Sequence, residues 1–555
     1  MTETLTSASI HDRYSESDIA AYYERGLWQS SSLFQIVAAQ AEARPNKTFI
    51  FDSTTGYTYA QLREQALRLA VGLRRAGVGA GDRVVVQLPN WAEFALIATA
   101  ISRIRAVIVP VMPIYRDQEV GYALQHSGAM MAITCGEVRG FDYAGMYRGM
   151  QTEVPQLERL VVVRPPAGPD MSADSALDGL LTEGSLQELE AELGADSRPD
   201  DPYLIVYTSG TTSRPKGCVH TFNTLHSSAI GMNRGWEYSE SDVQFGPSPI
   251  THSTGLVTNL LMPLIAGASS HLMEAWEPTE GIQRIQQHGC TIAVSATAFL
   301  QTMLPVYDPS KHDLSSMRVW TCAGAPIPGP VVEQASQMLG SGKVLSLYGR
   351  SENMVATMCT IHDDMQRSIT SDGAAVAGAE IKIVDDKGTE VPRGSEGDIA
   401  YRGPSHMLEY YRDPAQTEAL FTPDGFSRSG DLGFMDADGY VRVTGRTKDI
   451  VIRGGLNISA RELEDLLVTL PSVANVAVIG MPDERLGEKV CAYVVPAAGT
   501  ATPTLHEICG FLREHKVATP KLPERLEVVE ALPMTATGKI QKHLLREDVA
   551  KKLAG

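Results

Sequence analysis

Residues 203–217 read YLIVYTSGTTSRPKG, the most distinctive stretch of the chain. Its first five residues form a β-type run, and the ten that follow are dense in glycine and hydroxyl side chains. A loop of this composition turns tightly and offers backbone N–H groups, hydroxyls and the Lys216 ammonium to phosphate oxygens. The GxxxxGK[ST] pattern of a Walker loop is absent. The stretch therefore predicts a phosphate-binding loop of another type, placed directly after a strand.

Helix and strand patterns alternate on both sides of this loop through much of the first 340 residues. Apolar positions recur at helical spacing over residues 58–76 and 92–104, and buried strands are predicted at 83–88 and 106–112. Such alternation predicts layered α/β subdomains with largely parallel sheets. Residues 165–201 are rich in Pro, Gly, Ser and acidic residues, which predicts a solvated connection between subdomains.

The pattern changes after residue 381. Short β-like runs at 381–386, 397–403, 439–445 and 449–455 alternate with turns and predict a small antiparallel region. The remaining chain predicts an α+β unit with helices at 460–470 and 505–515 and strands at 473–479, 489–495 and 525–529. We therefore predict an α/β fold with a large N-terminal domain over 1–447 and a small C-terminal α+β domain over 448–555.

Composition excludes several classes of function. The 555 residues include 48 basic and 66 acidic side chains, a net charge of −18, whereas nucleic-acid binders usually carry a basic excess. No apolar run reaches the roughly 18 residues of a membrane span, and the polar N-terminus is not a secretory signal. The 7 cysteines are widely spaced without a CxxC pair, which argues against disulfides or zinc and favours a reducing cytosol. We expect a cytoplasmic protein with no nucleic-acid partner.

The phosphate loop resembles the signature loop of the adenylate-forming superfamily, which includes acyl-CoA synthetases, aryl-acid ligases, luciferases and peptide-synthetase adenylation domains. Other signature segments of that family follow in the expected order, and the resemblance spans nearly the whole chain, most weakly before residue 45. It implies that the loop holds the phosphates of ATP. The residues concerned are Thr208, Ser209, Gly210, Thr211, Thr212 and Lys216.

The segment 348–352, YGRSE, resembles the Tyr-Gly-x-Thr-Glu segment of the family. The resemblance implies that the Tyr348 ring lies against adenine, that Gly349 belongs to the nucleotide site, that the Ser351 hydroxyl reaches the α-phosphate, and that Glu352 holds Mg²⁺. One carboxylate is chemically sufficient, since Mg²⁺ takes its other ligands from phosphates and water. Ser351 keeps the hydroxyl of the usual Thr. Arg350 stands where an uncharged residue is common, so its effect on the acyl pocket is open.

Two further segments resemble parts of the family's nucleotide site. Residues 323–326, AGAP, resemble the small-residue loop that closes over adenine, which implicates Gly324, Ala325 and Pro326. Asp431 in Ser-Gly-Asp matches the carboxylate that binds both ribose hydroxyls, and Arg446 matches an arginine that reaches ribose or phosphate. A carboxylate accepts from two vicinal hydroxyls at once, which suits this role.

His252 matches the family position that gates the acyl pocket and contacts the substrate carboxylate. The resemblance assigns further small residues to this pocket, namely Ser253, Gly255, Ala323, Gly324 and Gly349. Domains that activate amino acids carry an Asp near this region to pair with the α-ammonium group, and no Asp stands between Phe245 and Leu256. The missing Asp therefore disfavours an amino acid. Glycines at 255, 324 and 349 indicate a pocket with room, which is compatible with an aryl, alicyclic or medium-chain acid.

The C-terminal motifs imply two half-reactions at one site. Lys539 matches the lysine that bridges the carboxylate and the α-phosphate during adenylation, and Lys448 matches the hinge between the domains. Gly454, Gly455 and Leu456 resemble a loop that lines the thiol channel in the second step. The small domain is then expected to be mobile and to rotate between the steps.

The resemblance predicts an ATP-dependent carboxylic acid–CoA ligase that uses Mg²⁺, with Lys539, Lys216, Glu352 and His252 as catalytic residues. Two alternatives stay open within the class: transfer of the acyl-AMP to a carrier-protein thiol, or to a separate thioesterifying enzyme. A third is a degenerate, non-catalytic nucleotide-binding paralogue. Both monomers and homodimers are compatible with the sequence.

Overall fold

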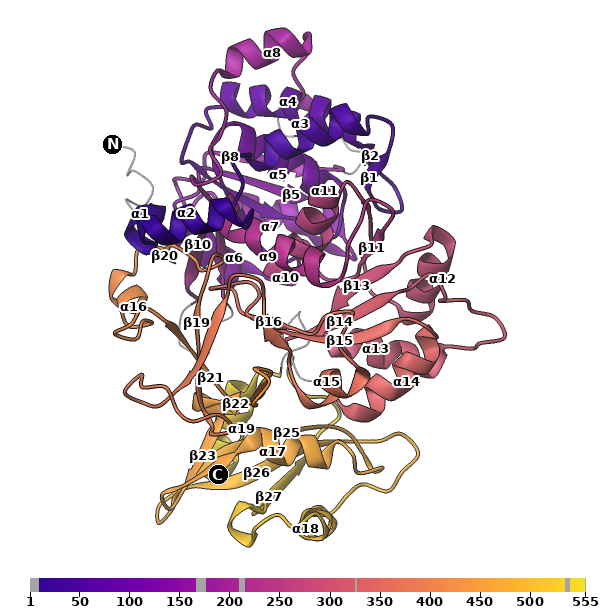
Figure 1. The fold of residues 1–555 in the computed structure, drawn as a ribbon, viewed down its shortest axis with the longest axis vertical. Helices are drawn as coiled ribbons and strands as arrows, with labels where there is room; N and C mark the ends of the chain where they lie inside the picture. The colour runs from indigo at the N-terminus through magenta and orange to yellow at the C-terminus, as the bar shows by residue number, and fades with distance from the viewer. Residues whose placement is uncertain (1–8, 166–175, 209–214, 325–326, 535–539, 555) are drawn as a thin grey trace. The chain divides into compact units, whose positions relative to one another are not determined.

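The chain forms two compact units in the computed structural model, which describes residues 9–165, 176–208, 215–324, 327–534 and 540–554 (Figure 1). Unit 1 comprises Met1–Ile369, Ala375–Glu380 and Arg402–Ala419. Unit 2 comprises Thr370–Ala374, Ile381–Tyr401 and Leu420–Gly555. The chain thus passes between the units several times, so neither unit is one continuous stretch of sequence.

The phosphate loop belongs to a sheet of unit 1 with the strand order β20-β10-β9-β4-β3-β5-β8. The strands from β9 to β8 pair in parallel, and β10 and β20 add an antiparallel edge. Their bounds are β3 (Arg83–Gln87), β4 (Val107–Pro110), β5 (Met131–Cys135), β8 (Arg159–Val163), β9 (Pro202–Tyr207), β10 (Gly217–Thr221) and β20 (Glu409–Tyr410). Continuous runs such as Val84–Val86 are buried, as expected of parallel strands covered on both faces.

A second sheet of unit 1 has the order β17-β16-β15-β14-β13-β11-β12-β1-β2. Its central strands are parallel, which agrees with the prediction, and β2 and β16 pair antiparallel near its edges. The bounds are β1 (Thr48–Phe51), β2 (Gly56–Thr58), β11 (Val243–Gly246), β12 (Ser269–Leu272), β13 (Ile292–Ser295), β14 (Val319–Ala323), β15 (Lys343–Tyr348), β16 (Thr357–Met358) and β17 (Ala374–Ala375).

Helices cover these sheets, and α3, α4 and α5 pack on one another (Figure 1). The helix predicted at 58–76 is α4, which begins after Thr58 because the Thr58 hydroxyl accepts from the Gln61 N–H. The main helices of unit 1 are α2 (Glu16–Glu24), α3 (Leu33–Ala43), α4 (Tyr59–Arg75), α5 (Glu93–Arg103), α6 (Asp117–Ser127), α7 (Tyr143–Met150), α8 (Leu186–Leu193), α9 (Phe222–Gly235), α11 (Met262–Ala266), α12 (Pro278–His288), α13 (Thr297–Met303), α14 (Gly329–Leu339) and α15 (Met365–Thr370).

The connection predicted at 165–201 carries more structure than its composition indicates. Its segment 186–193 forms α8, which packs on α4. Ser185 and Glu188 close a capping box at the start of this helix. Leu189 and Leu193 are buried, so the helix has an apolar face despite its acidic flanks.

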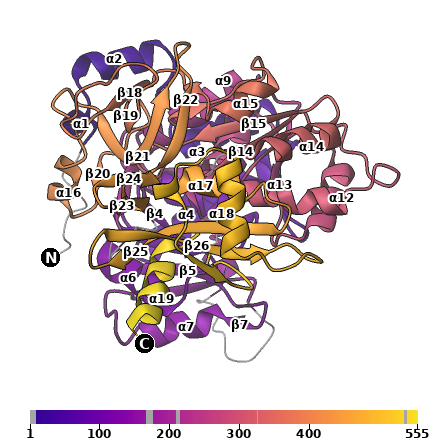
Figure 2. The ribbon, with the colours of Figure 1, turned by 90° about the horizontal axis from the view of Figure 1, so that it is seen from below.

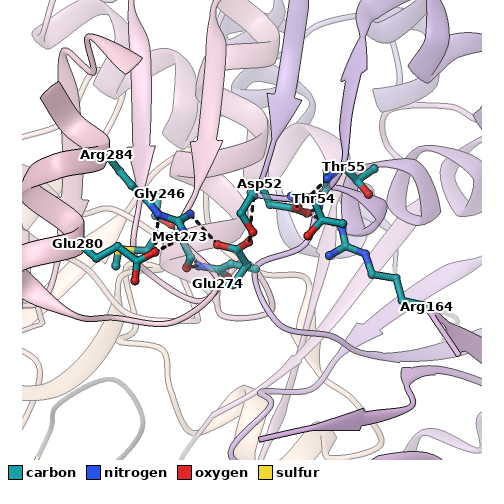
Figure 3. A network of polar contacts seen from close by, with 12 residues as sticks. Asp52, Thr54, Thr55, Arg164, Gly246, Met273, Glu274, Glu280 and Arg284 are labelled. Atoms are coloured by element: carbon teal, nitrogen blue, oxygen red, sulfur yellow. Dashed lines mark hydrogen bonds and ion pairs between the residues drawn. The ribbon is translucent and has the colours of Figure 1, made fainter. Parts of the chain in front are cut away.

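A partly buried polar network joins the two large sheets of unit 1 (Figure 3). Asp52, which follows β1, accepts from Arg164, which follows β8, at 2.6 Å. Arg164 also pairs with Glu93 at the start of α5, at 2.7 Å. The Asp52 side chain is fully buried, so an unpaired carboxylate there would be costly. The N–H of Ser53, next to Asp52, donates to Glu274 Oε1 at 2.9 Å, and Glu274 after β12 pairs with Arg284 on α12 at 2.8 Å.

Unit 2 contains two sheets. One is β18-β19-β21-β22, the small antiparallel region that the sequence predicts. In the other, β23 pairs with β24 and β26, so the run predicted at 449–455 does not join that antiparallel region. The bounds are β18 (Glu380–Val384), β19 (Gly397–Arg402), β21 (Ser427–Met435), β22 (Val441–Arg446), β23 (Ile450–Arg453), β24 (Leu456–Ser459), β25 (Val473–Asp483), β26 (Gly487–Pro496) and β27 (Arg525–Val528).

Alternating side chains of β25 and β26 bury both faces of the second sheet of unit 2. Val476 and Val478 pack with α17 (Ala460–Leu467) and α18 (Leu505–Glu514), whereas Ala477 and Ile479 pack with α19 (Lys542–Ala554) (Figure 2). This is the period of two expected of a strand. The α+β organisation predicted for the C-terminal part is therefore present.

The predicted boundary at Lys448 differs in position from the division into compact units, because residues 420–447 belong to unit 2. The boundary refers to a hinge motion, and it stays a prediction. All 7 cysteines lie in the described part of the chain, where they form no disulfide and are buried, as expected of small apolar side chains. Within the described ranges, no helix has the length and apolar character needed to cross a membrane.

Candidate active site

Three of the predicted segments follow parallel strands of one sheet in unit 1. The turn that carries His252 follows β11, Ala323 ends β14, and Tyr348 ends β15. Because these strands are parallel, their carboxyl ends lie at the same edge of the sheet. Ligands of open α/β sheets bind outside this edge. The structure thus gathers the predicted acyl and adenine segments at a place suited to a ligand.

The ends of the phosphate loop are fixed at the start of β10. The Thr208 N–H donates to the Lys216 carbonyl at 2.9 Å, and the Lys216 N–H donates to Thr208 Oγ1 at 3.4 Å. The Lys216 ammonium donates to Gln416 Oε1 at 2.7 Å and lies 4.6 Å from the centre of the Tyr410 ring. The predicted loop residues between these ends lie outside the described residues, namely Ser209, Gly210, Thr211 and Thr212.

The Glu352 carboxylate lies beside the same tyrosine. The Tyr410 hydroxyl donates to Glu352 Oε1 at 2.6 Å. Burial raises the pKa of Glu352, but the charge of Arg350, the hydrogen bond from Tyr410 and the charge of Lys216 outweigh it, so the pKa is below its ordinary value. Glu352 is therefore an ionised carboxylate at neutral pH.

The turn after β15 is shaped by close backbone contacts. A Cβ atom at Gly349 would lie 1.9 Å from the Met354 carbonyl oxygen, so this position requires glycine. The Ser351 carbonyl accepts a hydrogen bond from His220 Nε2 at 2.7 Å. His220 is fully buried, and burial lowers its pKa to about 4, so the ring is neutral at physiological pH.

Arg350 acts electrostatically on the carboxylate side of this turn. Its positive charge lowers the pKa of Glu352, and, after burial, it also lowers the pKa of His406. Its backbone N–H donates to Asn353 Oδ1 at 3.3 Å. These observations associate Arg350 with Glu352. An effect of Arg350 on the acyl pocket, which the sequence leaves open, stays untested.

His252 lies at the amino end of the short helix α10 (Ser253–Gly255). His252 Nδ1 accepts from the Thr254 N–H at 3.3 Å, so in the neutral ring Nε2 carries the proton. A Cβ atom at Gly255 would lie 2.1 Å from the Pro249 carbonyl oxygen, and Ser253 is buried. A π-helix over Leu256–Leu261 follows, an element that often occurs at functional sites.

Asn90, after β3, holds the loop that leads to His252. Its Nδ2 lies 3.2 Å from the Gly246 carbonyl, 3.0 Å from that of Ser248 and 3.1 Å from that of Met273, and its Oδ1 accepts from the Ile250 N–H at 2.7 Å. Asn90 is buried, so these contacts satisfy its amide. Figure 3 shows Gly246 and Met273 beside the network that joins the two sheets.

In unit 2 the two predicted ribose residues lie directly opposite each other on neighbouring strands. Asp431 of β21 pairs in register with Arg446 at the end of β22. Arg446 Nε lies 2.8 Å from Asp431 Oδ1. Only 9 % of the Asp431 side chain is exposed, compared with 44 % of Arg446, so the arginine screens a nearly buried carboxylate.

The predicted hinge and thiol-channel residues also belong to unit 2. Lys448 lies in a 3-10 turn over Thr447–Asp449, and its carbonyl accepts from the Arg546 guanidinium at 3.1 Å. Gly454 and Gly455 both have positive φ and form the two-residue turn between β23 and β24. Leu456 follows and is 40 % exposed. The predicted residues Ala325, Pro326 and Lys539 lie outside the described residues.

Sequence reasoning missed Tyr410, Gln416 and His220, which contact predicted site residues. Tyr410 reaches Glu352 and Lys216 because β20 pairs with β10 across nearly two hundred positions of sequence. No local periodicity reports such a pairing. The run Tyr410–Tyr411 before Asp413–Pro414 is a visible signal of an edge strand that ends in a turn, but it does not indicate a partner.

The charges present fit a Mg²⁺ ion that is shared with phosphates. Among the described residues there is no group of three or more His, Cys, Asp or Glu side chains that could hold a metal ion. Glu352 supplies one ionised carboxylate. Mg²⁺ commonly binds through one or two carboxylates together with substrate phosphates and water, so this donor set is sufficient.

Comparisons with known proteins identify the chain as an adenylate-forming enzyme. Residues 37–411 match the family model described as AMP-binding enzyme, and residues 462–539 match the model of the AMP-binding enzyme C-terminal domain. The chain belongs to the AMP-binding enzyme family.

Relatives and solved structures cover almost the whole chain. The medium-chain fatty-acid–CoA ligase of Escherichia coli (strain K12) is 35 % identical over 97 % of this chain and 94 % of its own length. The 2,3-dihydroxybenzoate–AMP ligase of Bacillus subtilis (strain 168) is 29 % identical over 96 % of each chain. A crystal structure of an anthranilate CoA ligase in complex with anthranoyl-AMP has a TM-score of 0.82 and 26 % identity, with 95 % of this chain and 98 % of that chain covered.

Proposed function

We propose that this protein is a carboxylic acid–CoA ligase of the reducing cytosol that acts on an aryl, alicyclic or medium-chain acid. The observation that carries the proposal is the meeting of Lys216 and Glu352, from separate signature segments, at one tyrosine beside the phosphate loop. An ammonium and an ionised carboxylate in this arrangement suit a polyphosphate and its cation. The activities for which the relatives are named, a medium-chain fatty-acid–CoA ligase among them, support the same class.

In the first half-reaction, an oxygen of the acid attacks the α-phosphorus of ATP, and the bond to pyrophosphate breaks to give acyl-AMP. Thr208 and Lys216 hold the phosphates, and Lys539 neutralises charge that develops on the carboxylate and α-phosphate oxygens. His252, with its proton on Nε2, donates to the acid. Glu352 holds Mg²⁺, which supplies charge neutralisation on the phosphates when bound. Positioning rather than covalent catalysis accounts for the rate.

In the second half-reaction, the CoA thiolate sulfur attacks the acyl carbon, and the bond between that carbon and the AMP oxygen breaks. The C-terminal part rotates about Lys448, which withdraws Lys539 and presents Gly454, Gly455 and Leu456 to the thiol. Asp431 and Arg446 hold the ribose in both steps. No cysteine nucleophile is needed, in keeping with the burial of every cysteine.

A second function has a specific observation in its favour. The 2,3-dihydroxybenzoate–AMP ligase among the relatives carries the name of an enzyme that forms an acyl-AMP. In this alternative, the acyl-AMP passes to a carrier-protein thiol or to a separate enzyme. The degenerate, non-catalytic paralogue is less favoured, because Lys539, Glu352, Asp431 and Arg446 are all present.

The test is a product analysis with aliphatic, alicyclic and aryl acids, ATP and Mg²⁺, with and without CoA, followed by mass spectrometry. Acyl-AMP that becomes acyl-CoA on addition of CoA is the expected result. Acyl-AMP that persists with CoA would favour the carrier-protein alternative. Lys539→Ala is the matched control, since it should abolish pyrophosphate release while nucleotide binding is kept.

A further inference from the structure

The segment 402–419 returns from unit 2 to unit 1 and brings a tyrosine to the phosphate loop. Its strand β20 pairs with β10, with Tyr410 opposite Cys218, two positions after Lys216. The pairing is extended by the Leu408 N–H, which donates to the Val219 carbonyl at 2.8 Å, and by the Tyr411 N–H, which donates to the Gly217 carbonyl at 2.7 Å. Backbone register therefore fixes Tyr410 beside Lys216.

The Tyr410 side chain contacts both charged residues of the predicted phosphate site. Its hydroxyl donates to Glu352 Oε1 at 2.6 Å, and its ring centre lies 4.6 Å from Lys216 Nζ. Tyr410 is 3 % exposed, so little of its side chain is in contact with water. Burial and the neighbouring Glu352 charge raise the pKa of Tyr410, so the hydroxyl keeps its proton and remains a donor.

These contacts hold two opposite charges through one neutral residue. Lys216 donates to the neutral amide of Gln416, and within the described ranges it forms no ion pair with Glu352. A direct ion pair would satisfy each charge with the other and would have to be broken when phosphates arrive. A phenol ring and a phenol hydroxyl orient the ammonium and the carboxylate without a direct ion pair between the two, although the nearby charges of Arg350 and Lys216 still act on Glu352.

We propose that Tyr410 is a positioning residue for adenylation, which sets the placement of Glu352 for the cation and of Lys216 for the phosphates. The inference rests on the proposed function, in which these two residues bind Mg²⁺ and ATP. Tyr410 contacts neither reacting atom in this role. It acts only on the half-reaction that uses the metal and the polyphosphate.

The test compares Tyr410→Phe, Tyr410→Leu and the control Tyr411→Phe. Tyr411 is the adjacent buried tyrosine, and its hydroxyl donates to the Ser127 carbonyl at 3.4 Å instead of to a site residue. Two rates are measured for each protein: acid-dependent ATP–pyrophosphate exchange as a function of Mg²⁺ concentration, and acyl-CoA formation from synthetic acyl-AMP and CoA. The second rate needs neither ATP nor release of pyrophosphate.

Tyr410→Phe keeps the ring and loses the hydrogen bond to a charged group, so the Mg²⁺ concentration for half-maximal exchange should rise about tenfold. Tyr410→Leu also loses the ring under Lys216, so its KM for ATP should rise by about three- to fivefold more. Acyl-CoA formation from acyl-AMP should stay within about twofold in both variants, since the lost contacts serve the first step. Tyr411→Phe should leave all three quantities unchanged.

Equal loss of both half-reactions in Tyr410→Phe, without a change in Mg²⁺ dependence, would show a merely structural tyrosine and overturn the inference. Titration of MgATP into the wild-type and Tyr410→Phe proteins by calorimetry separates this outcome from failure of the proposed function. If the wild-type protein adenylates no acid but binds MgATP, a weaker affinity in Tyr410→Phe still supports the inference. An unchanged affinity contradicts it whatever the acid.

Discussion

The predicted phosphate residues of unit 1 and the predicted ribose residues of unit 2 hold their carboxylates in different ways. In unit 1, Glu352 accepts from the neutral hydroxyl of Tyr410, which comes from a distant segment. In unit 2, Asp431 pairs at 2.8 Å with Arg446, its cross-strand neighbour. The first carboxylate contacts a neutral phenol, whereas the second contacts a guanidinium. Under the predicted roles, the phenol-bound carboxylate serves a cation and the arginine-paired carboxylate serves neutral hydroxyls.

The largest expected effect is that of Glu352→Gln, which removes the charge and keeps the shape. Pyrophosphate exchange should fall by about a hundred- to a thousandfold, the range observed when one electrostatic stabiliser is removed. Acyl-CoA formation from acyl-AMP should be nearly unaffected, since that step uses no pyrophosphate. Stopped assays of each half-reaction measure both values. Equal losses in the two half-reactions would contradict the difference between the predicted phosphate residues and the predicted ribose residues.

Two Gly→Ala variants allow a direct comparison of their effects on the free energy of unfolding. Gly349→Ala places a Cβ 1.9 Å from a backbone carbonyl, and we expect a loss of about 3 kcal/mol or more, as for a severe packing conflict. Gly430 has a φ of +72°, but a Cβ added there would meet no atom within 4 Å, so Gly430→Ala should cost about 1–2 kcal/mol from backbone strain alone. Denaturant titration of the two variants checks the order, and a reversed order would contradict the argument.

A smaller effect that covers both half-reactions is expected at the predicted ribose residues. Asp431→Asn should raise the KM for ATP about tenfold, because a charge-assisted hydrogen bond to the ribose becomes neutral. It should weaken use of synthetic acyl-AMP by a similar factor, since the ribose is bound in both steps. Arg446→Ala is the control, and it should have the smaller effect because the arginine is 44 % exposed. A defect confined to exchange would contradict this assignment.

The smallest effect concerns pH. Burial raises the pKa of Glu352, and the Arg350 charge is the largest influence that lowers it. In Arg350→Met the Glu352 pKa should rise, so exchange activity should be lost at a higher pH as the solution is acidified. The pH profile of exchange at saturating Mg²⁺ measures this shift. If the loss of activity at low pH occurs at the same pH in Arg350→Met, Arg350 acts elsewhere, for example on the carboxylic acid substrate.

The sequence predicts those features that depend on local pattern. The strand at 83–88 is recoverable as a short continuous apolar run, and the helix at 58–76 because its burial has a period of 3.6 residues; they correspond to β3 and α4. The helix α8 was not recoverable from the composition of 165–201, since its few buried leucines stand among acidic residues. Its capping residues Ser185 and Glu188 were the one local sign.

The candidate site shows the same difference between features with a local sequence pattern and features that depend on distant contacts. Motif resemblance selects Lys216, Glu352 and Asp431, because each stands in a segment with distinctive neighbours. It does not select Tyr410 or His220, whose contacts depend on strand pairing and on burial. The register between β21 and β22 brings Asp431 to Arg446, a pair that the motifs supplied separately. Their roles in catalysis stay predictions until the variants above are measured.

The interleaving of the two units along the chain has a consequence for dividing the polypeptide. A break after residue 419 leaves β18 and β19 on the first fragment and β21 and β22 on the second, although β19 and β21 are hydrogen-bonded neighbours. Each fragment then carries an open sheet edge, which favours aggregation when it is alone and association when the other is present. The two pieces should therefore be poorly soluble apart and should reassemble on co-expression, which makes this position a natural split site for a two-part reporter.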